Sequence, residues 1–422
     1  MNPLWPHLRW RAAVVAGVSV GLLALITHEE AWEGLGVQHL QPYFFDLVAI
    51  LAAGQAWHQG LDVYASNPLD PFGRPHVYGP WWLVSGPLGL TTADARWLGA
   101  LLGLAFVVAA TAVLAPRRPG AALVSLLLLL SPPVLYGIER ANNDLVVFLL
   151  FAAGGALAVR ASGRAAEWGA GLLGLAAALK IYPLAALPAL AARAAPRRRV
   201  LGWLAGAAGA CLLVFLLWRT DYTSALAGAP RPETIFAYGW RVLPLAWSKL
   251  PHLRGPMLFG GLPVLALAAV WIVARRGKLL AAVPCTGAAT AWFVCGALAW
   301  LFCWAANTNY PYRAVLLLLP AGLWLAQAEG TDAPRAALAR TQLAACVLAF
   351  WLWPLKAWWA GAIGGGLPGA DIWLAAVFAI EQTLVAAINL ALALGVAGWA
   401  WRRWHAPDDA AVSASTVVAA GP

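Results

Sequence analysis

The stretch AAVVAGVSVGLLALIT at residues 12–27 contains no charged side chain and follows a basic pair, Arg9 and Arg11. A helix crosses the hydrocarbon core of a bilayer with about 20 apolar residues, and runs close to that length recur along the chain. Hydrophobic residues make up 62% of the 422 positions and charged residues only 11%, whereas about 25% of a typical soluble chain is charged. Membrane barrels are built from short alternating strands instead. The sequence therefore predicts an all-α polytopic membrane protein.

The basic residues indicate how these helices are oriented. The net charge is +10, but Lys and Arg lie in clusters between apolar runs rather than along one face, which argues against a nucleic-acid partner. Such clusters mark cytoplasmic loops, so we expect about 12 transmembrane helices with both termini inside. We expect one domain over residues 1–405 and a disordered cytoplasmic tail at 406–422. The expected spans are 12–27, 96–115, 121–136, 145–159, 200–218, 257–274, 279–305, 314–328, 343–359 and 372–401, with two half-length helices in 168–192.

Residues 168–192 leave two interpretations open. The segment is too short for two ordinary spans, yet basic residues flank both of its ends, and Lys180-Ile-Tyr-Pro183 stands in its middle. Proline disfavours helix at the residue before it, which favours two half-length helices that meet at Tyr182. One kinked helix is the alternative, and it would place one basic cluster on the wrong side of the membrane.

The first extracytoplasmic loop, residues 28–94, is unusually long. Residues 46–58 are expected to form an amphipathic helix in the plane of the interface. The apolar run that begins at Pro80 is too short to cross a bilayer, so we expect a re-entrant or interfacial helix there.

Polar side chains fall on the extracytoplasmic side of this topology and are expected to converge. An ammonium at membrane depth costs several kcal/mol unless it is paired, so Lys180 is a candidate functional residue. Asp46 could instead favour the start of a helix through the helix dipole, and Arg313 could extend to the interface. The converging residues are Asp46, Glu139, Arg140, Lys180, Arg241 and those of segment 307–313; Asn142, Asn143 and Asp144 could also cap the span that follows.

Cofactor motifs are absent from the sequence. The five cysteines are scattered in apolar runs without CxxC spacing, so core packing is the favoured interpretation. We find no zinc, Walker or dinucleotide pattern and predict no cofactor. Asp46, Glu139 and Asp144 could hold a divalent metal, although nothing in the sequence fixes their geometry.

Several short motifs, in this order and spacing, resemble the GT-C-type membrane glycosyltransferases. Within that type the chain resembles glycosyltransferase family 87 (DUF2029, polyprenol-phosphate mannosyltransferase-like). One departure is the sequence Asn-Tyr-Pro-Tyr-Arg at residues 309–313, where family members carry a Trp-Asp-His-like patch. The motifs are Phe45-Asp46, Gly60-Leu-Asp-Val-Tyr64, Tyr78-Gly-Pro80, Glu139-Arg-Ala-Asn-Asn-Asp144 and Leu179-Lys-Ile-Tyr-Pro183.

The resemblance implies a GT-C-like fold and an enzyme that moves mannose or another hexose from a polyprenyl-phosphate donor to an extracytoplasmic glycolipid or glycan. In this type an acid of the first extracytoplasmic loop is the general base, and Asp46 matches that place. Fixed cations would stabilise the phosphate that leaves in an inverting transfer. The candidate phosphate ligands are Lys180, Arg140, Arg313 and Arg241. The candidate substrate contacts are Glu139, Asn142, Asn143, Asp144, Tyr182, Asn309, Tyr310, Tyr312 and Tyr78.

Two other functions stay open from the sequence. A transporter or flippase of a lipid-linked sugar would also use cations within the membrane, but its polar residues should follow a whole path across the bilayer. A non-catalytic membrane scaffold is the second alternative. For each of these functions we expect a multi-pass protein of a bacterial plasma membrane, and for the enzyme an extracytoplasmic active site.

Overall fold

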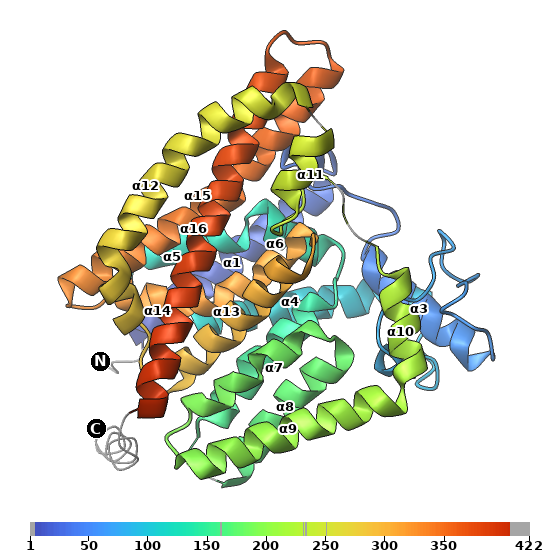
Figure 1. Ribbon diagram of the computed structural model, residues 1–422. Helices are drawn as coiled ribbons and strands as arrows, with labels where there is room; N and C mark the ends of the chain where they lie inside the picture. The colour runs from blue at the N-terminus through green and yellow to red at the C-terminus, as the bar shows by residue number, and fades with distance from the viewer. Residues whose placement is uncertain (1–4, 161–162, 231, 233, 250, 406–422) are drawn as a thin grey trace.

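The computed structural model describes residues 5–160, 163–230, 232, 234–249 and 251–405 (Figure 1). The tail predicted at 406–422 lies outside these residues. The described chain is almost entirely helical, with one isolated antiparallel bridge between Tyr238 and Asn309. An all-α polytopic membrane fold is therefore confirmed.

Among the described residues, seven helical stretches are long and apolar enough to cross a membrane. An eighth is added if α5 (Pro119–Leu129) and α6 (Pro132–Glu139), bent by 56°, count as one span. The expected total of about 12 stays a prediction, because it also needs shorter helices such as α7 (Asp144–Ala158). The seven stretches are α1 (Trp5–Thr27, with the candidate span starting at Leu8), η2 with α4 (Thr92–Asp94 and Ala95–Leu114), α9 (Arg197–Leu217), η4 with α12 (Pro251–Leu253 and Arg254–Ala281), α13 (Ala288–Ala306), α15 (Ala333–Gly364) and α16 (Ala370–His405).

Residues 163–192 form two helices rather than one kinked helix. α8 (Gly163–Leu179) ends just before Lys180, and the 3₁₀ helix η3 (Tyr182–Ala192) begins with Pro183 at its second position. Both helices pack against α9. The far end of η3 meets the C-terminal end of α16, where Arg403 Nε donates to the Ala191 carbonyl at 2.8 Å. The chain therefore turns at Lys180 and returns.

One expected boundary is wrong. The basic run at residues 275–278 was expected to separate two spans, but α12 continues through it to Ala281. Arg and Lys are good helix formers, so they set the side of the membrane without stopping a helix. The break falls around Pro284, and α13 starts at Ala288.

The first long loop carries α2 (Glu30–Gly34), α3 (Phe45–His58) and the short 3₁₀ helix η1 (Pro80–Ser85). α3 packs against η1 and α4 and buries most of its residues, so it does not lie free on an interface. α3 approaches the end of η1 closely because Gly86 has no side chain: a Cβ at residue 86 would lie 2.0 Å from the Gly54 carbonyl oxygen. The short apolar run at Pro80, which forms η1, therefore packs over α3.

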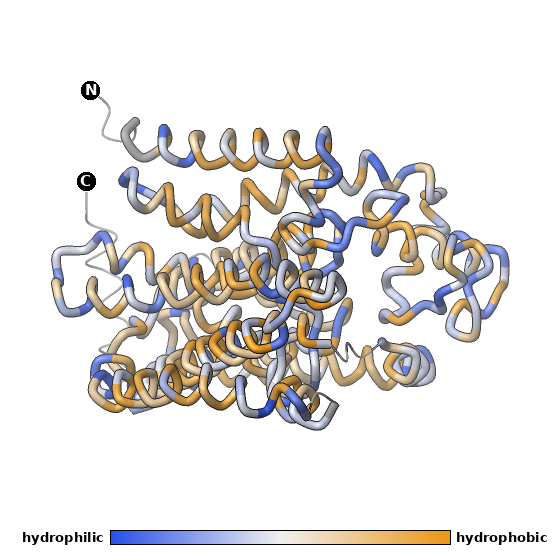
Figure 2. The backbone as a smooth tube through the Cα atoms, turned by 90° about the horizontal axis from the view of Figure 1, so that it is seen from above, coloured by the Kyte–Doolittle hydropathy of each residue, from blue (hydrophilic) through white to orange (hydrophobic). Residues whose placement is uncertain are grey.

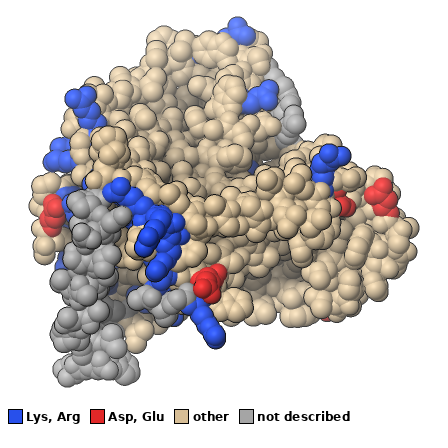
Figure 3. Space-filling model, turned by 60° about the horizontal axis from the view of Figure 1, so that its bottom comes forward, with Lys and Arg blue, Asp and Glu red and all other residues tan. Residues whose placement is uncertain are grey.

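The polar segments and the basic clusters lie at different ends. α3 and α10 (Arg219–Gly228) lie at the end of the molecule away from both termini (Figure 1). Figure 2 shows mainly hydrophobic long helices, with hydrophilic stretches at their ends and in the loop region. Figure 3, which looks toward the bottom of Figure 1, shows most of the visible Lys and Arg toward the left, with others at the top and right and few Asp or Glu. The separation of the basic clusters from the polar loop agrees with the positive-inside rule.

Candidate functional site

Asp46 is held in place by backbone pairing between the first loop and the end of α6. The amide of Phe44, which has a positive φ of 63°, donates to the Glu139 carbonyl at 3.1 Å. The amide of Asp46 donates to the Arg140 carbonyl at 3.2 Å. Two segments almost a hundred residues apart are thereby joined, and the carboxylate at the start of α3 is brought to the Glu139–Asp144 motif.

Three polar side chains face the Asp46 carboxylate. Asn142 Nδ2 donates to Asp46 Oδ2 at 2.6 Å. The Nη1 atoms of Arg140 and Arg74 lie 3.7 Å and 4.0 Å from Asp46 Oδ1. The carboxylate is one wall of a cavity of about 390 Å³ that Tyr78 also lines. We call this the acid cavity.

Arg74 was not a predicted site residue. Asp70 binds it at two points, at 2.7 Å and 3.0 Å, and its guanidinium lies 3.6 Å from the centre of the Phe45 ring. Burial alone would raise the pKa of Asp70, but the hydrogen bonds from Arg74 lower it below the usual value. The sequence could have marked Arg74 as a candidate site residue, because it is the only Lys or Arg between Arg11 and Arg96.

A second charged cluster surrounds the buried Asp144. Its Oδ1 is bonded by Lys180 Nζ and, at 2.8 Å, by the Tyr182 hydroxyl. Arg313 Nε lies 3.7 Å from its Oδ2. Asn142 connects the two clusters, because its Oδ1 accepts from the Asp144 amide at 2.9 Å while its Nδ2 holds Asp46.

Lys180, Tyr182 and Arg313 line a second cavity of about 380 Å³, which we call the cation cavity. Its remaining lining is largely apolar and includes Leu226 and Phe302. The acid and cation cavities adjoin, since both are lined by Val77, Tyr78, Pro230, Tyr310 and Tyr312.

Tyr78 stands where the two cavities meet and stays a neutral phenol. Burial raises its pKa well above the usual value, and the charges of Asp46 and Asp144 raise it further. Its neighbour His76, with ring centres 5.7 Å apart, is also neutral, because burial lowers its pKa to about 4. Neither group adds a charge at the junction.

Arg313 is oriented by the segment before it. Its Nη1 donates to Asn309 Oδ1, and Asn309 Nδ2 donates to the Asn307 carbonyl at 2.9 Å. Within the described chain, neither Arg313 Nε nor Asp144 Oδ2 makes a hydrogen bond. The cation cavity therefore contains a buried donor that a bound anion could use.

Glu139 and Asn143 are close to the site but line neither cavity. Glu139 accepts from His39 Nδ1 at 2.9 Å and from the Leu40 amide at 3.3 Å, so it anchors the loop. Neither polar atom of the Asn143 side chain is hydrogen-bonded within the described chain. Asn142 and Asp144 line neither cavity either, so a direct substrate contact stays a prediction for all four residues.

Arg241 does not join the other cations, which corrects the expected convergence. It is exposed and lines a separate cavity with Trp240, Asn307 and Thr308. The cause is the backbone: the Trp240 amide donates to the Trp304 carbonyl at 3.0 Å, next to the Tyr238–Asn309 bridge. This backbone pairing positions Arg241 at the separate cavity and away from the cation cavity.

The three acids considered for a metal face different partners. Asp46 faces two arginines, Glu139 bonds His39, and Asp144 bonds Lys180. In the part of the chain that the structure describes, no three His, Cys, Asp or Glu residues are grouped so as to hold a metal ion.

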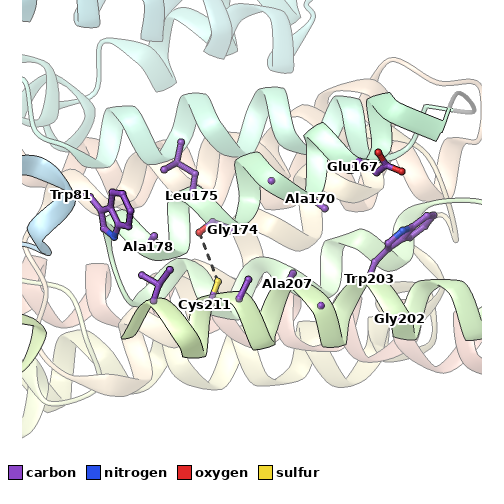
Figure 4. Close-up of a pocket in the computed structure, with 14 residues that line it drawn as sticks. Trp81, Glu167, Ala170, Gly174, Leu175, Ala178, Gly202, Trp203, Ala207 and Cys211 are labelled. Atoms are coloured by element: carbon purple, nitrogen blue, oxygen red, sulfur yellow. Dashed lines mark hydrogen bonds between the residues drawn. The ribbon is translucent and has the colours of Figure 1, made fainter. Parts of the chain in front are cut away.

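Another cavity, about 530 Å³, lies between α8 and α9 and is almost wholly apolar (Figure 4). Trp81 stands at one end, and Glu167 and Trp203 stand at the other. Gly171, Gly174, Gly202 and Gly206 line it, and a Cβ at any of the four would meet open space. We call this cavity the α8–α9 groove. Its Trp81 end lies near the cation cavity, because the Trp82 indole donates to the carbonyl of Leu179, which lines that cavity.

The fold and the site define a polytopic membrane protein with a buried, charged site where its helices meet the first long loop. Residues 77–282 match the model of glycosyltransferase family 87, which confirms the resemblance carried by the motifs. The matched region includes Tyr78, Arg140 and Lys180, whereas Asp46 and Arg313 lie outside it. This match, which covers just under half of the chain, supports a membrane glycosyltransferase. Comparison with curated proteins and with solved structures gave no match.

Proposed function

We propose that the protein transfers mannose or another hexose from a polyprenyl-phosphate donor to an extracytoplasmic glycolipid or glycan, with inversion and with Asp46 as general base. The observation that carries this proposal is the meeting of two cavities of opposite character. One presents the Asp46 carboxylate and the other presents Lys180 and Arg313. The donor sugar would lie between them, beside Tyr78 and Tyr312.

This placement suits an inverting displacement. The acceptor hydroxyl approaches the anomeric carbon from the acid cavity, and its proton passes to Asp46 as the new glycosidic bond forms. The bond from that carbon to the phosphate oxygen breaks on the opposite side, and its electron pair stays with the polyprenyl phosphate. Lys180 and Arg313 stabilise the added negative charge, which counts for more in a buried site than in water.

The neighbouring surfaces suit a lipid-linked donor. Arg313 offers a guanidinium that can bind phosphate through two parallel hydrogen bonds, and Lys180 adds a point charge. The apolar wall formed by Leu226 and Phe302 leads away from these cations. The α8–α9 groove then offers an apolar channel for the prenyl chain (Figure 4).

The test is transfer in vitro from a panel of polyprenyl-phosphate hexoses to extracted membrane glycolipids and glycans. Asp46→Asn keeps the size of the side chain but removes the base, so it should lower the rate by about 10²–10⁴-fold. Asp62→Asn is the matched control, because Asp62 is an exposed acid of the same loop that bonds only local amides in the described structure. Full activity in Asp46→Asn would refute the base, and no transfer from any donor of the panel would refute the reaction.

A further inference from the structure

A further cavity, about 270 Å³, opens beside the acid cavity and shares Tyr310 with the cation cavity. Segments distant in sequence form it: Pro232 with residues 234–236, which we call the strap, the middle of α15, and the first loop. Its size is close to the lower limit for small-molecule sites. The lining residues are Gly36, Gln38, Tyr136, Pro232, Thr234, Phe236, Tyr310, Pro311 and Trp353.

This cavity is continuous with the place where an acceptor must arrive. Gln38, Tyr136 and Tyr310 line both it and the acid cavity. Lys180 and Arg313 line neither of the two. A ligand in the side cavity would therefore reach Asp46 from the side away from the donor phosphate.

The aromatic wall of the cavity is rigid. Phe236 and Trp353 have ring centres 5.2 Å apart, and the Trp353 indole donates to the Gly36 carbonyl at 2.8 Å. Gly36 has a φ of 72°, and a Cβ there would lie 2.8 Å from the indole, so only glycine fits. The fully buried Lys356 lies 4.8 Å from the centre of the Trp353 ring and donates to the Ile235 carbonyl at 3.1 Å. It is ion-paired with Glu381.

The chemistry of the lining suits a sugar ring. Phe236 offers a half-buried ring for the C–H face of a pyranose, and the almost fully buried Trp353 packs behind it. Gln38, Thr234 and Tyr310 offer an amide and hydroxyls for the rim of the sugar. A few polar groups in an otherwise aromatic pocket fix the orientation of a ligand. None of the described lining residues is charged, in contrast to the donor site.

We propose that this side cavity is the acceptor subsite and binds one pyranose ring of a glycan or glycolipid, with Phe236 as the stacking residue and Trp353 as its support. The proposal rests on the proposed function for the direction of transfer, but binding of a pyranose can be measured without any reaction. An acyl chain is the competing occupant, and it is an outcome of the test.

The probe is a panel of methyl pyranosides, measured by saturation-transfer NMR on the purified full chain in lipid nanodiscs, where no glycoside detergent competes. At least one glycoside should bind to the wild type and equally to Asp46→Asn. Phe236→Ala should weaken binding by about tenfold, the value of a lost aromatic contact, and Phe236→Tyr should restore it. Trp240→Ala is the control, since Trp240 is a half-exposed aromatic residue lining a different cavity.

The same variants separate the two proposals in the transfer assay. If the donor is active, Phe236→Ala should raise the KM for the acceptor about tenfold and leave the KM for the donor unchanged. If a glycoside binds in a way that depends on Phe236 but no transfer is observed, the proposed donor is contradicted and the acceptor subsite is still supported. Three results would contradict the acceptor subsite. The first is transfer by Phe236→Ala with an unchanged KM for the acceptor, and the second is displacement of the glycoside probe by an alkyl chain alone. The third is the absence of any glycoside binding.

Discussion

Sequence pattern alone gives Arg313 and Arg241 the same role, whereas the fold gives them different neighbours. Arg313 is within 3.7 Å of Asp144 in the cation cavity, and Arg241 lines a separate one. The distinction comes from backbone pairing at Tyr238 and Asn309, which no local pattern reveals.

This difference can be measured. Arg313→Gln removes a charged donor and should raise the KM for the polyprenyl-phosphate sugar about 10–100-fold, the worth of one charge-assisted hydrogen bond. Arg241→Gln should leave the same KM unchanged. Equal effects of the two changes would show that the cation cavity does not hold the donor phosphate.

Single residues also show how far the sequence could predict the site. A lysine within an apolar run needs a partner, so Lys180 was a sound candidate. Its partner Asp144 could equally have been a helix cap, and only the turn after α8 brings the two together. Arg74 sits in what reads as an ordinary turn, and its contact with Asp46 depends on the loop folding back onto α3.

At the scale of elements, Pro183 marked a helix boundary correctly, whereas the basic run at residues 275–278 did not; Pro263 and Pro354 lie inside helices. Pro183 starts η3 where the sequence predicts a break, because its ring disfavours helix at the residue before it. The run at 275–278 stays helical, because charge sets which side a segment occupies and not where its helix ends. The interfacial helix expected at 46–58 is helical but enclosed, since η1 and α4 cover it.

The α8–α9 groove gives a prediction of its own. Gly206→Leu places a side chain in the groove and also replaces a poor helix former, so folding should not suffer. It should raise the KM for a long-chain polyprenyl donor at least about tenfold and leave that for a short-chain donor unchanged. Gly209→Leu is matched, because Gly209 lies one turn further along α9 in open space outside the groove. If chain length made no difference to Gly206→Leu, the groove would not hold the prenyl chain.

At the scale of the whole molecule, the polar site and the basic clusters lie at different ends. This arrangement predicts that the first loop lies outside the cell and the basic clusters lie in the cytoplasm. Asp62 and Arg335 are both exposed, in the first loop and at the start of α15. In intact cells a membrane-impermeant maleimide should label Asp62→Cys, whereas Arg335→Cys should be labelled only after permeabilisation. Wild type is the control, because Cys211, Cys295, Cys303 and Cys346 are buried and Cys285 is half-buried. Labelling of both new cysteines from the same side would overturn the topology.

The side chain of Asn142 connects Asp46 to the cluster around Asp144. Its amide nitrogen holds Asp46 while its oxygen holds the backbone of Asp144, so it cannot shift toward one without leaving the other. In the proposed reaction, one small amide would therefore govern the distance between the base Asp46 and the cations that bind the phosphate. Substitutions in the cavity walls would then change which sugars fit without changing that distance.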